Sequence, residues 1–323
     1  MAPSYILYSF KRALMKKTSF VQPKTLLAWA ICASLLSSLS YTIMLTFAKF
    51  SLEFCTTNQL AFFRSLISFF LTVGVTAFSS QKGSYISFLK TTEINIHLIR
   101  CSSALIAVYL YMYSIKNISI TEGSLLFNTS PFFIPFIAYF WKKSPIDVKI
   151  WPGIFTAFLG LALLAHPSNS YYTPSFWIAL LAGIMGAVSV VALRFSHYSE
   201  PLFRSLFYYG VFSTIVTGII CSPEGLNLSS VLQTKALLPI LVVGITGFSY
   251  QVLIAVAIKY APAKQIGPFF YISVIFGTIF DLMFWQKTLK PVEILGIFLI
   301  IAGLFLMIFL VKSKKTDKIS FSE

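Results

Sequence analysis

Ten long apolar segments dominate this sequence and restrict it to one broad fold class. Hydrophobic residues make up 57% of its 323 residues, and charged residues only 11%. A soluble domain normally has about a quarter of its residues charged, so this chain has too few charges to cover its surface against water. A helix that crosses the roughly 30 Å hydrocarbon core of a bilayer needs about 20 apolar residues. The sequence therefore predicts an all-α integral membrane protein with ten transmembrane helices.

The linkers between the ten segments are short and leave no room for a separate soluble domain. Most segments end at a helix-breaking or charged signal, such as Lys82-Gly83 or Ala261-Pro262. The runs are continuously apolar and lack the period-two alternation of outer-membrane strands, which argues against a β-barrel. The expected helices span 26–47, 58–78, 98–115, 121–140, 150–166, 174–193, 201–221, 236–258, 263–284 and 291–311.

The basic residues, which give a net charge of +15, are clustered between the apolar runs. They form no stripe along a helix face, so nucleic acid is not an expected partner. With the N-terminus placed in the cytoplasm, nineteen Lys and Arg, Arg100 among them, fall on the cytoplasmic side and five on the other. The positive-inside rule then predicts that both termini are cytoplasmic, with an arm over 1–25 and a tail over 312–323. The Phe-, Ile- and Lys-rich usage suits an AT-rich bacterial genome, so the expected location is a bacterial inner (plasma) membrane.

Four short motifs recur in the same order, 140 to 144 residues apart. One such match is unremarkable in a Phe- and Ile-rich chain, but four in order indicate a duplicated five-helix unit, with repeats over 26–166 and 174–311. Because five is odd, the two copies must cross the membrane in opposite directions. Inverted repeats place a binding site between the halves, near the bilayer midplane. The recurring motifs are Phe63-Arg64-Ser65-Leu66 with Phe203-Arg204-Ser205-Leu206, Ile115-Lys116 with Ile258-Lys259, Phe140-Trp141 with Phe284-Trp285, and Gly153-Ile154-Phe155 with Gly296-Ile297-Phe298.

Several of these motifs together carry a family resemblance. They are Phe62-Phe63-Arg64, Tyr113-Ser114-Ile115-Lys116, Pro131 with Pro135, the run from Ala257 to Tyr260, and the paired glycines Gly153 with Gly160 and Gly296 with Gly303. Over residues 26–311 the chain resembles the drug/metabolite transporter superfamily in its ten-helix EamA-repeat form. The resemblance implies a carrier of a small organic metabolite that works by alternating access. It departs from the usual pattern at Trp141-Lys142 and Trp285-Gln286, where members commonly have Gly-Glu.

Polar and aromatic residues within the helices supply a candidate binding site. The repeat offset pairs Asn128 with Tyr271 and Ser130 with Ser273, and polar groups at matching depths are expected at a central site. The same groups also serve to join helices by hydrogen bonds. Among the tyrosines of the third helix, Tyr109 is the one deep enough to stack on a planar solute. The candidate substrate-binding residues are Asn128, Ser130, Tyr271, Ser273, Tyr109, Gln251, Tyr41 and Phe270.

Arg64 lies about two turns into the second helix, where an unpaired charge costs several kcal/mol. It either meets a carboxylate or phosphate of the solute, or plays a structural role by snorkelling outward or pairing with Glu53 or Glu122. Its duplicate Arg204 at the opposite face favours the structural role. The acids deepest in the segments, Glu122 and Asp281, lie near outer ends, so exchange or facilitated diffusion is expected rather than proton symport.

The narrowest functional hypothesis is transport of S-adenosylmethionine or a similar nucleoside-bearing solute, in exchange with S-adenosylhomocysteine. It rests on Gly267-Pro268-Phe269-Phe270-Tyr271, which resembles the ninth-helix signature of branches that carry such metabolites. The alternatives are an amino-acid or drug exporter of the same fold and a membrane scaffold without transport. An enzyme is not expected, because no histidine lies mid-helix and no two acids share a helix turn. The four cysteines have no ligand-like spacing, so neither metal nor cofactor is expected, and the chain is expected to be a monomer or homodimer.

Overall fold

The structure is a computed structural model that describes residues 24–79, 90–114, 126–143, 148–165, 173–196, 200–224, 234–261, 263–286 and 290–313. All regular secondary structure in these ranges is helical. Seven helical segments are long and apolar enough to cross a membrane, and three shorter apolar helices complete a set of ten. This confirms the predicted all-α membrane fold.

The helical elements follow one another with few interruptions. They are α2 (Lys24–Ser51), α3 (Thr57–Ser79), α5 (Ile94–Ser114), α7 (Ser130–Lys142), η1 (Val148–Ile150), α8 (Trp151–Ala165), α9 (Pro174–Ser196), α10 (Leu202–Cys221), η3 (Ser222–Glu224), α12 (Thr234–Tyr260), α13 (Ala263–Ile266), η4 (Gly267–Tyr271), α14 (Ile272–Trp285) and α15 (Pro291–Ser313).

Local sequence explains where some of these helices begin. At the start of α3, the Thr56 hydroxyl accepts a hydrogen bond from the Gln59 amide, and the Gln59 side chain accepts one from the Thr56 amide. This reciprocal arrangement is a capping box, which satisfies amides that have no partner within the helix. At the start of α15, the Glu293 carboxylate accepts a hydrogen bond from the Lys290 amide in a similar way.

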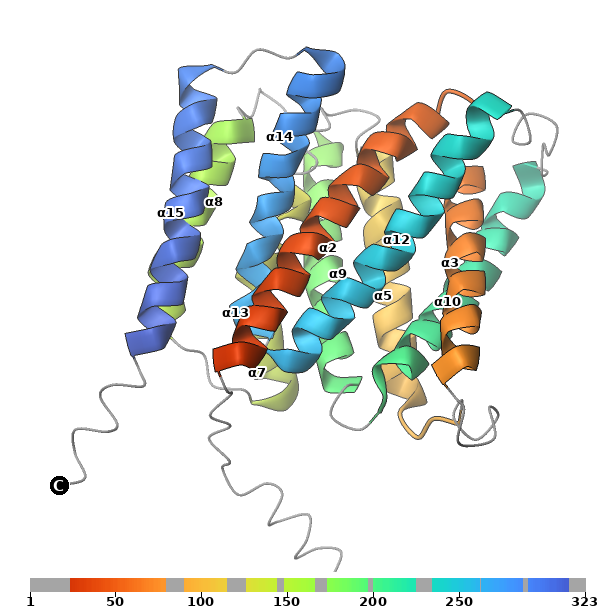
Figure 1. The fold of residues 1–323 in the computed structure, drawn as a ribbon, viewed down its shortest axis with the longest axis horizontal. Coiled ribbons are helices and arrows are strands. Elements are labelled where there is room, and N and C mark those ends of the chain that lie inside the picture. Colours follow the sequence, from red (N-terminus) through yellow and green to blue (C-terminus); the bar gives the residue numbers. More distant parts are fainter. Residues whose placement is uncertain are drawn as a thin grey trace, which may run out of the picture.

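The two halves of the chain are inverted with respect to each other. Successive membrane-crossing segments run in alternating directions, so α2 and its counterpart α9 point opposite ways (Figure 1). As a result, α2 begins and α15 ends on the same face of the bundle (Figure 1). We call this face the terminal face. The predicted pair of inverted five-helix repeats is therefore confirmed.

The contacts between helices repeat under exchange of the halves. Helix α2 of the first half packs along α12 of the second, and its counterpart α9 packs along α5 of the first. In the same way, α2 contacts α14, and α9 contacts α7. The pairs α3 with α10 and α8 with α15 each join equivalent helices. These matched contacts indicate a pseudo-twofold axis between the repeats.

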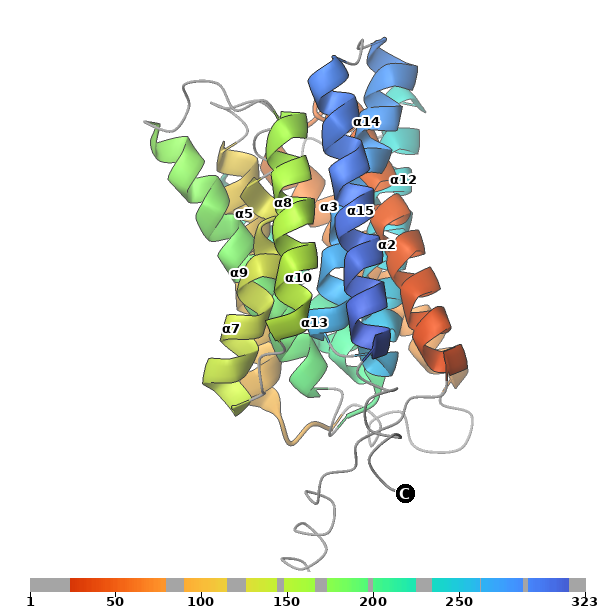
Figure 2. The ribbon, with the colours of Figure 1, turned by 90° about the vertical axis from the view of Figure 1, so that its left-hand side faces the viewer.

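The pair α8 and α15 lies side by side at one edge of the bundle (Figure 2). Their backbones meet at glycines. A Cβ atom added to Gly303 would stand 2.6 Å from the carbonyl oxygen of Gly153, and one added to Gly160 would stand 2.5 Å from that of Gly296. We call these four residues the glycine seam. The paired glycines noted in the sequence thus serve direct helix–helix packing, as small residues do in membranes.

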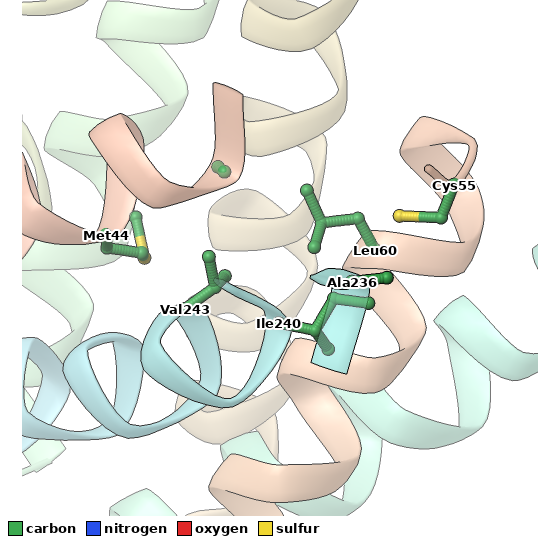
Figure 3. Packing of buried hydrophobic residues seen from close by; sticks show 7 residues of the cluster. Met44, Cys55, Leu60, Ala236, Ile240 and Val243 are labelled. Carbon is green, nitrogen blue, oxygen red and sulfur yellow. The ribbon is translucent and has the colours of Figure 1, made fainter. Parts of the chain in front are cut away.

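A buried apolar cluster joins α12 to α2 and α3 at the other end of the bundle. Met44 of α2 and Leu60 of α3 contact Ile240 and Val243 of α12 in this cluster (Figure 3). It connects the first repeat to the second, so the repeats share one core and do not form separate domains.

Three of the expected helices differ from the structure. The segment 263–284 is not one helix, because α13, the 3₁₀ turn η4 and α14 divide it. The segment 121–140 is interrupted by a turn at Asn128 and Thr129, and its residues before 126 lie outside the described ranges. The third helix begins at Ile94 and not at 98, so Arg100, which the charge count places on the cytoplasmic side, lies nearly two turns into α5.

Candidate functional site

Two adjoining cavities lie between the repeats, with volumes of ≈ 420 Å³ and ≈ 740 Å³. They share the residues Tyr41, Phe127, Gly186, Val190 and Tyr250. Their described lining comes from both halves of the chain and includes neither α8 nor α15. The cavities therefore lie between the repeats and away from the glycine seam.

Most of the candidate residues line these cavities. The smaller cavity contains Asn128, Ser130, Phe270 and Ser273 in its wall. Gln251 lines the larger cavity, and Tyr41 lines both. The equivalent serines, Ser130 and Ser273, thus come together from opposite repeats, as a pseudo-twofold site requires.

Tyr271 and Tyr109 line neither cavity. Tyr271 is fully buried in a cluster with Ala157, Leu161 and Ile300, on the side of η4 that faces α8 and α15. In the third helix it is Tyr111 that lines the larger cavity. Residues two apart on a helix point in different directions, so the register that brings Tyr111 to the cavity turns Tyr109 away.

The smaller cavity lies at the two helix interruptions. The Ser38 hydroxyl of α2 donates to the Phe269 carbonyl at 3.2 Å, and the Thr42 hydroxyl donates to the Ser273 carbonyl at 3.0 Å. On the other repeat, Gly183 of α9 allows close approach to the carbonyl oxygens of Leu126 and Phe127, which an added Cβ would meet at 2.6 and 3.0 Å. Interrupted helices at equivalent positions of two inverted repeats are the expected location of a solute site.

Aromatic rings from three helices and the 126–129 segment surround the cavities. Tyr41 is stacked on Phe127 with a centroid separation of 6.3 Å and lies 5.1 Å from Tyr250. Tyr111 lies 5.4 Å from Phe127. Rings arranged in this way present flat, partly polar surfaces against which a planar solute can stack.

Arg100 is the most buried charged residue at the site, with 1% of its surface exposed. Its Nη1 donates to the carbonyl and hydroxyl oxygens of Ser205, the latter at 2.7 Å, and its Nη2 donates to Gln251 Oε1 at 3.3 Å. The guanidinium carbon lies 5.2 Å from the centre of the Tyr209 ring. Arg100 therefore connects α5 of the first repeat to α10 and α12 of the second. These partners, distant in sequence, compensate the charge that led us to expect Arg100 outside the membrane.

Arg64 also lines the larger cavity. Glu53, one of its two expected partners, is exposed and forms no ion pair with it among the described residues. The other, Glu122, lies outside the described ranges. The side chain of Arg64 packs against Gly247 of α12, where an added Cβ would meet its Nε at 3.0 Å. It points toward the second repeat rather than outward to the interface.

A buried carboxylate, which the sequence analysis missed, lies at the terminal face. Glu200, between α9 and α10, places its Oε2 2.6 Å from His97 Nε2 of α5, with both side chains 1% exposed. Its Oε1 accepts hydrogen bonds from the Thr91 hydroxyl and, at 3.1 Å, from the Thr92 amide. Burial alone would raise the pKa of Glu200, but the hydrogen bonds from Thr91 and His97 outweigh it, and the net pKa lies below the usual value. This cluster joins the two repeats.

Replacing Glu200 with glutamine is expected to destabilise the protein by about 1–3 kcal/mol, because charged hydrogen bonds are lost. The pKa of Glu200 is lower in the folded protein than in the unfolded one, where it is about 4.5. Glu200 therefore stabilises the protein at pH values above about 4.5, and this stabilisation is lost as the pH falls below that value toward the folded-state pKa. Thermal midpoints at pH 7 and pH 4 test this. The exposed Glu53→Gln variant is the control, and an equal midpoint loss in both variants would contradict the prediction.

Two inverted halves with a central aromatic cavity at paired helix interruptions define a membrane carrier of small solutes. The sequence profile of the EamA-like transporter family matches residues 28–165 and 173–309, so the chain belongs to this family. Both halves match, which makes it a protein with two EamA domains. Membership of a transporter family confirms that the protein is not an enzyme.

Relatives in this family are named for different solutes. The pseudopaline exporter CntI of Pseudomonas aeruginosa is 23% identical over 279 residues, which are 86% of this chain and 95% of that protein. The riboflavin transporter of Brucella anthropi is 25% identical over 198 residues, 59% of this chain and 69% of the relative. The S-adenosylmethionine uptake transporter of Rickettsia conorii is 22% identical over 221 residues, which are 68% of this chain and 72% of that protein. The chain is a transporter of small metabolites.

A crystal structure of a protein 13% identical to this chain shares the fold. It superposes with a TM-score of 0.73 and covers 88% of this chain and 98% of its own. As for metals, the described residues contain no group of three His, Cys, Asp or Glu side chains that could hold an ion.

Proposed function

We propose that the protein moves a small organic metabolite with a planar part across a bacterial inner membrane, using the cavities between its repeats as the binding site. The observation that carries this is the lining itself, which combines residues of both repeats with rings from α2, α5 and α12. A site shared by two inverted halves opens to one side or the other when the halves rock, which is alternating access. We place the terminal face in the cytoplasm, because the basic residues favour that orientation.

The narrower proposal is S-adenosylmethionine or a similar nucleoside-bearing solute, exchanged with S-adenosylhomocysteine. The base of such a solute would stack against the rings of Tyr41 and Phe127 that line the cavity, and the amide of Asn128 would bind its polar edge. The serines Ser130 and Ser273 offer hydroxyl groups on either side. An amino-acid or drug exporter remains the alternative within the class, since aromatic cavities also accept such solutes.

Counterflow in proteoliposomes tests the proposal. Vesicles that contain the purified full chain are loaded with unlabelled S-adenosylhomocysteine and mixed with labelled S-adenosylmethionine outside. We expect transient accumulation of label above that in protein-free vesicles. Accumulation of other planar metabolites but not of this one would reject the narrow substrate. If no member of a metabolite panel accumulated, a scaffold without transport would be the better description.

The matched variants for this assay are Asn128→Leu and Thr278→Val. Asn128 lines the smaller cavity, so its replacement is expected to reduce the initial rate of counterflow at least tenfold. Thr278 of α14 lines neither cavity, and its hydroxyl donates to the Val274 carbonyl of its own helix. Its replacement is expected to leave the rate within a factor of two. A rate loss shared by both variants would mean that the cavity does not hold the solute.

A further inference from the structure

The larger cavity has a strongly one-sided charge. Its described lining contains Arg64 and Arg100 and no aspartate or glutamate. Two ion pairs are present among the described residues, and both use the same carboxylate: Glu200 pairs with His97 and with Arg204 at the terminal face. The two cavity arginines therefore have no carboxylate of this part of the chain to balance them.

The two arginines line the same cavity as a pair of tyrosines. Tyr41 of α2 and Tyr250 of α12 lie in the wall of the larger cavity together with Arg64 and Arg100. Both tyrosines also line the smaller cavity, and their ring centres are 5.1 Å apart. The larger cavity, which carries both positive charges, therefore adjoins the smaller one at this ring pair.

The two arginines differ in their remaining hydrogen-bonding capacity. Arg100 is held by Ser205, Gln251 and the Tyr209 ring. Arg64 has no hydrogen bond or ion pair with another described residue, and its side chain packs against Gly247. A guanidinium carries five N–H donors in a fork that fits a carboxylate or phosphate. The site thus holds two guanidinium cations in a low-dielectric environment, and the N–H donors of Arg64 have no partner among the described residues. Both features favour an anion as the bound group.

We propose that the transported solute carries a carboxylate or phosphate group, and that Arg64 binds this group in the field of the fixed Arg100. The proposal rests on the proposed function and specifies its substrate class: a planar part lies among the rings of the smaller cavity, and an anionic group reaches into the larger one. Arg64 binds the anion directly, and Arg100 sets the local potential.

The test compares matched pairs of compounds that differ in the anionic group. The carboxylate pair is indole-3-acetate with indole-3-acetamide, and the phosphate pair is adenosine monophosphate with adenosine. Binding to the purified full chain in detergent is followed by thermal shift, since a ligand stabilises the folded state by mass action. In at least one pair we expect the anion to bind roughly tenfold to a hundredfold more tightly than its neutral partner, the range of a charged hydrogen bond. Which pair responds distinguishes carboxylate from phosphate.

Three variants locate the effect. Arg64→Gln is expected to reduce the preference for the anion to less than threefold, and Arg64→Lys to retain part of it. Arg204→Gln is the control, because it makes the same change at the duplicated position, outside both cavities, and is expected to leave the preference intact. An unchanged preference in Arg64→Gln would overturn the proposal.

The other outcomes separate this proposal from the carrier assignment. If the neutral partners bind as tightly as the anions, the anion site is rejected while a carrier of planar solutes stands. If none of the four compounds binds and counterflow of the metabolite panel also fails, both are rejected.

Discussion

Replacing Arg100 with alanine is expected to abolish transport and to lower the free energy of unfolding by about 2–4 kcal/mol, because buried polar partners lose their hydrogen bonds. The Ser205 hydroxyl and the Gln251 amide would be left facing an empty volume. The contact between α5 and the second repeat would also be lost, so the cavity would lose its shape as well as its charge. Thermal midpoint and initial counterflow rate are the two measurements.

A comparison with Gln251 tests whether this loss follows from the proposed contacts. Gln251→Leu removes only the 3.3 Å bond and is expected to cost less stability than Arg100→Ala. Because the two residues are in contact, their double variant is expected to be more stable than the sum of the single effects predicts. Strictly additive losses would show that Arg100 and Gln251 act independently, which would contradict the structure.

Adding a single methyl group to the glycine seam is expected to destabilise the protein by about 1–3 kcal/mol, the usual cost of overpacking. In Gly303→Ala, the new Cβ would lie 2.5 Å from the Ala157 amide nitrogen and 2.6 Å from the Gly153 carbonyl oxygen. Both are backbone atoms of α8, so neither can turn aside as a side chain does. Midpoints of unfolding in detergent measure the effect.

Gly74→Ala is the matched control for the seam. Gly74 is a glycine of α3, and an added Cβ there would meet nothing within 4 Å. Alanine is favoured over glycine in a helix by up to about 1 kcal/mol, so this variant is expected to be as stable as the parent or slightly more stable. Equal destabilisation by the two variants would mean that α8 and α15 are not in backbone contact.

The helices and their duplication could be predicted from the sequence because both are local signals. An apolar run of about 20 residues is sufficient to indicate a membrane helix, and motifs such as those around Gly153 and Gly296 reveal the repeat by position alone. The same symmetry identified Ser130 and Ser273, which do meet at the smaller cavity. Inversion followed from the odd number of helices in each copy.

The parts that could not be predicted depend on contacts between distant residues. Arg100 lies near the start of an apolar run, and its partners are 105 and 151 residues away. Glu200 lies in a linker, where an acid is usually solvated, and is buried because the start of α5 packs against it. The choice between Tyr109 and Tyr111 depends on the rotation of α5 about its axis. The continuously apolar stretch 104–113 around these tyrosines does not reveal that rotation. The breaks at Asn128 and η4 lie within runs whose hydropathy is continuous.

The glycine seam also limits how the carrier can move. Where side chains lie between two helices, the side chains can change rotamer, and the helices can then slide past each other. Where the two backbones are in contact, sliding makes backbone atoms collide. We therefore infer that α8 and α15 form a fixed pivot, and that access to either side of the bilayer switches by tilting of the remaining eight segments around it. The hinge would then lie at one edge of the bundle and consist of the fifth helix of each half.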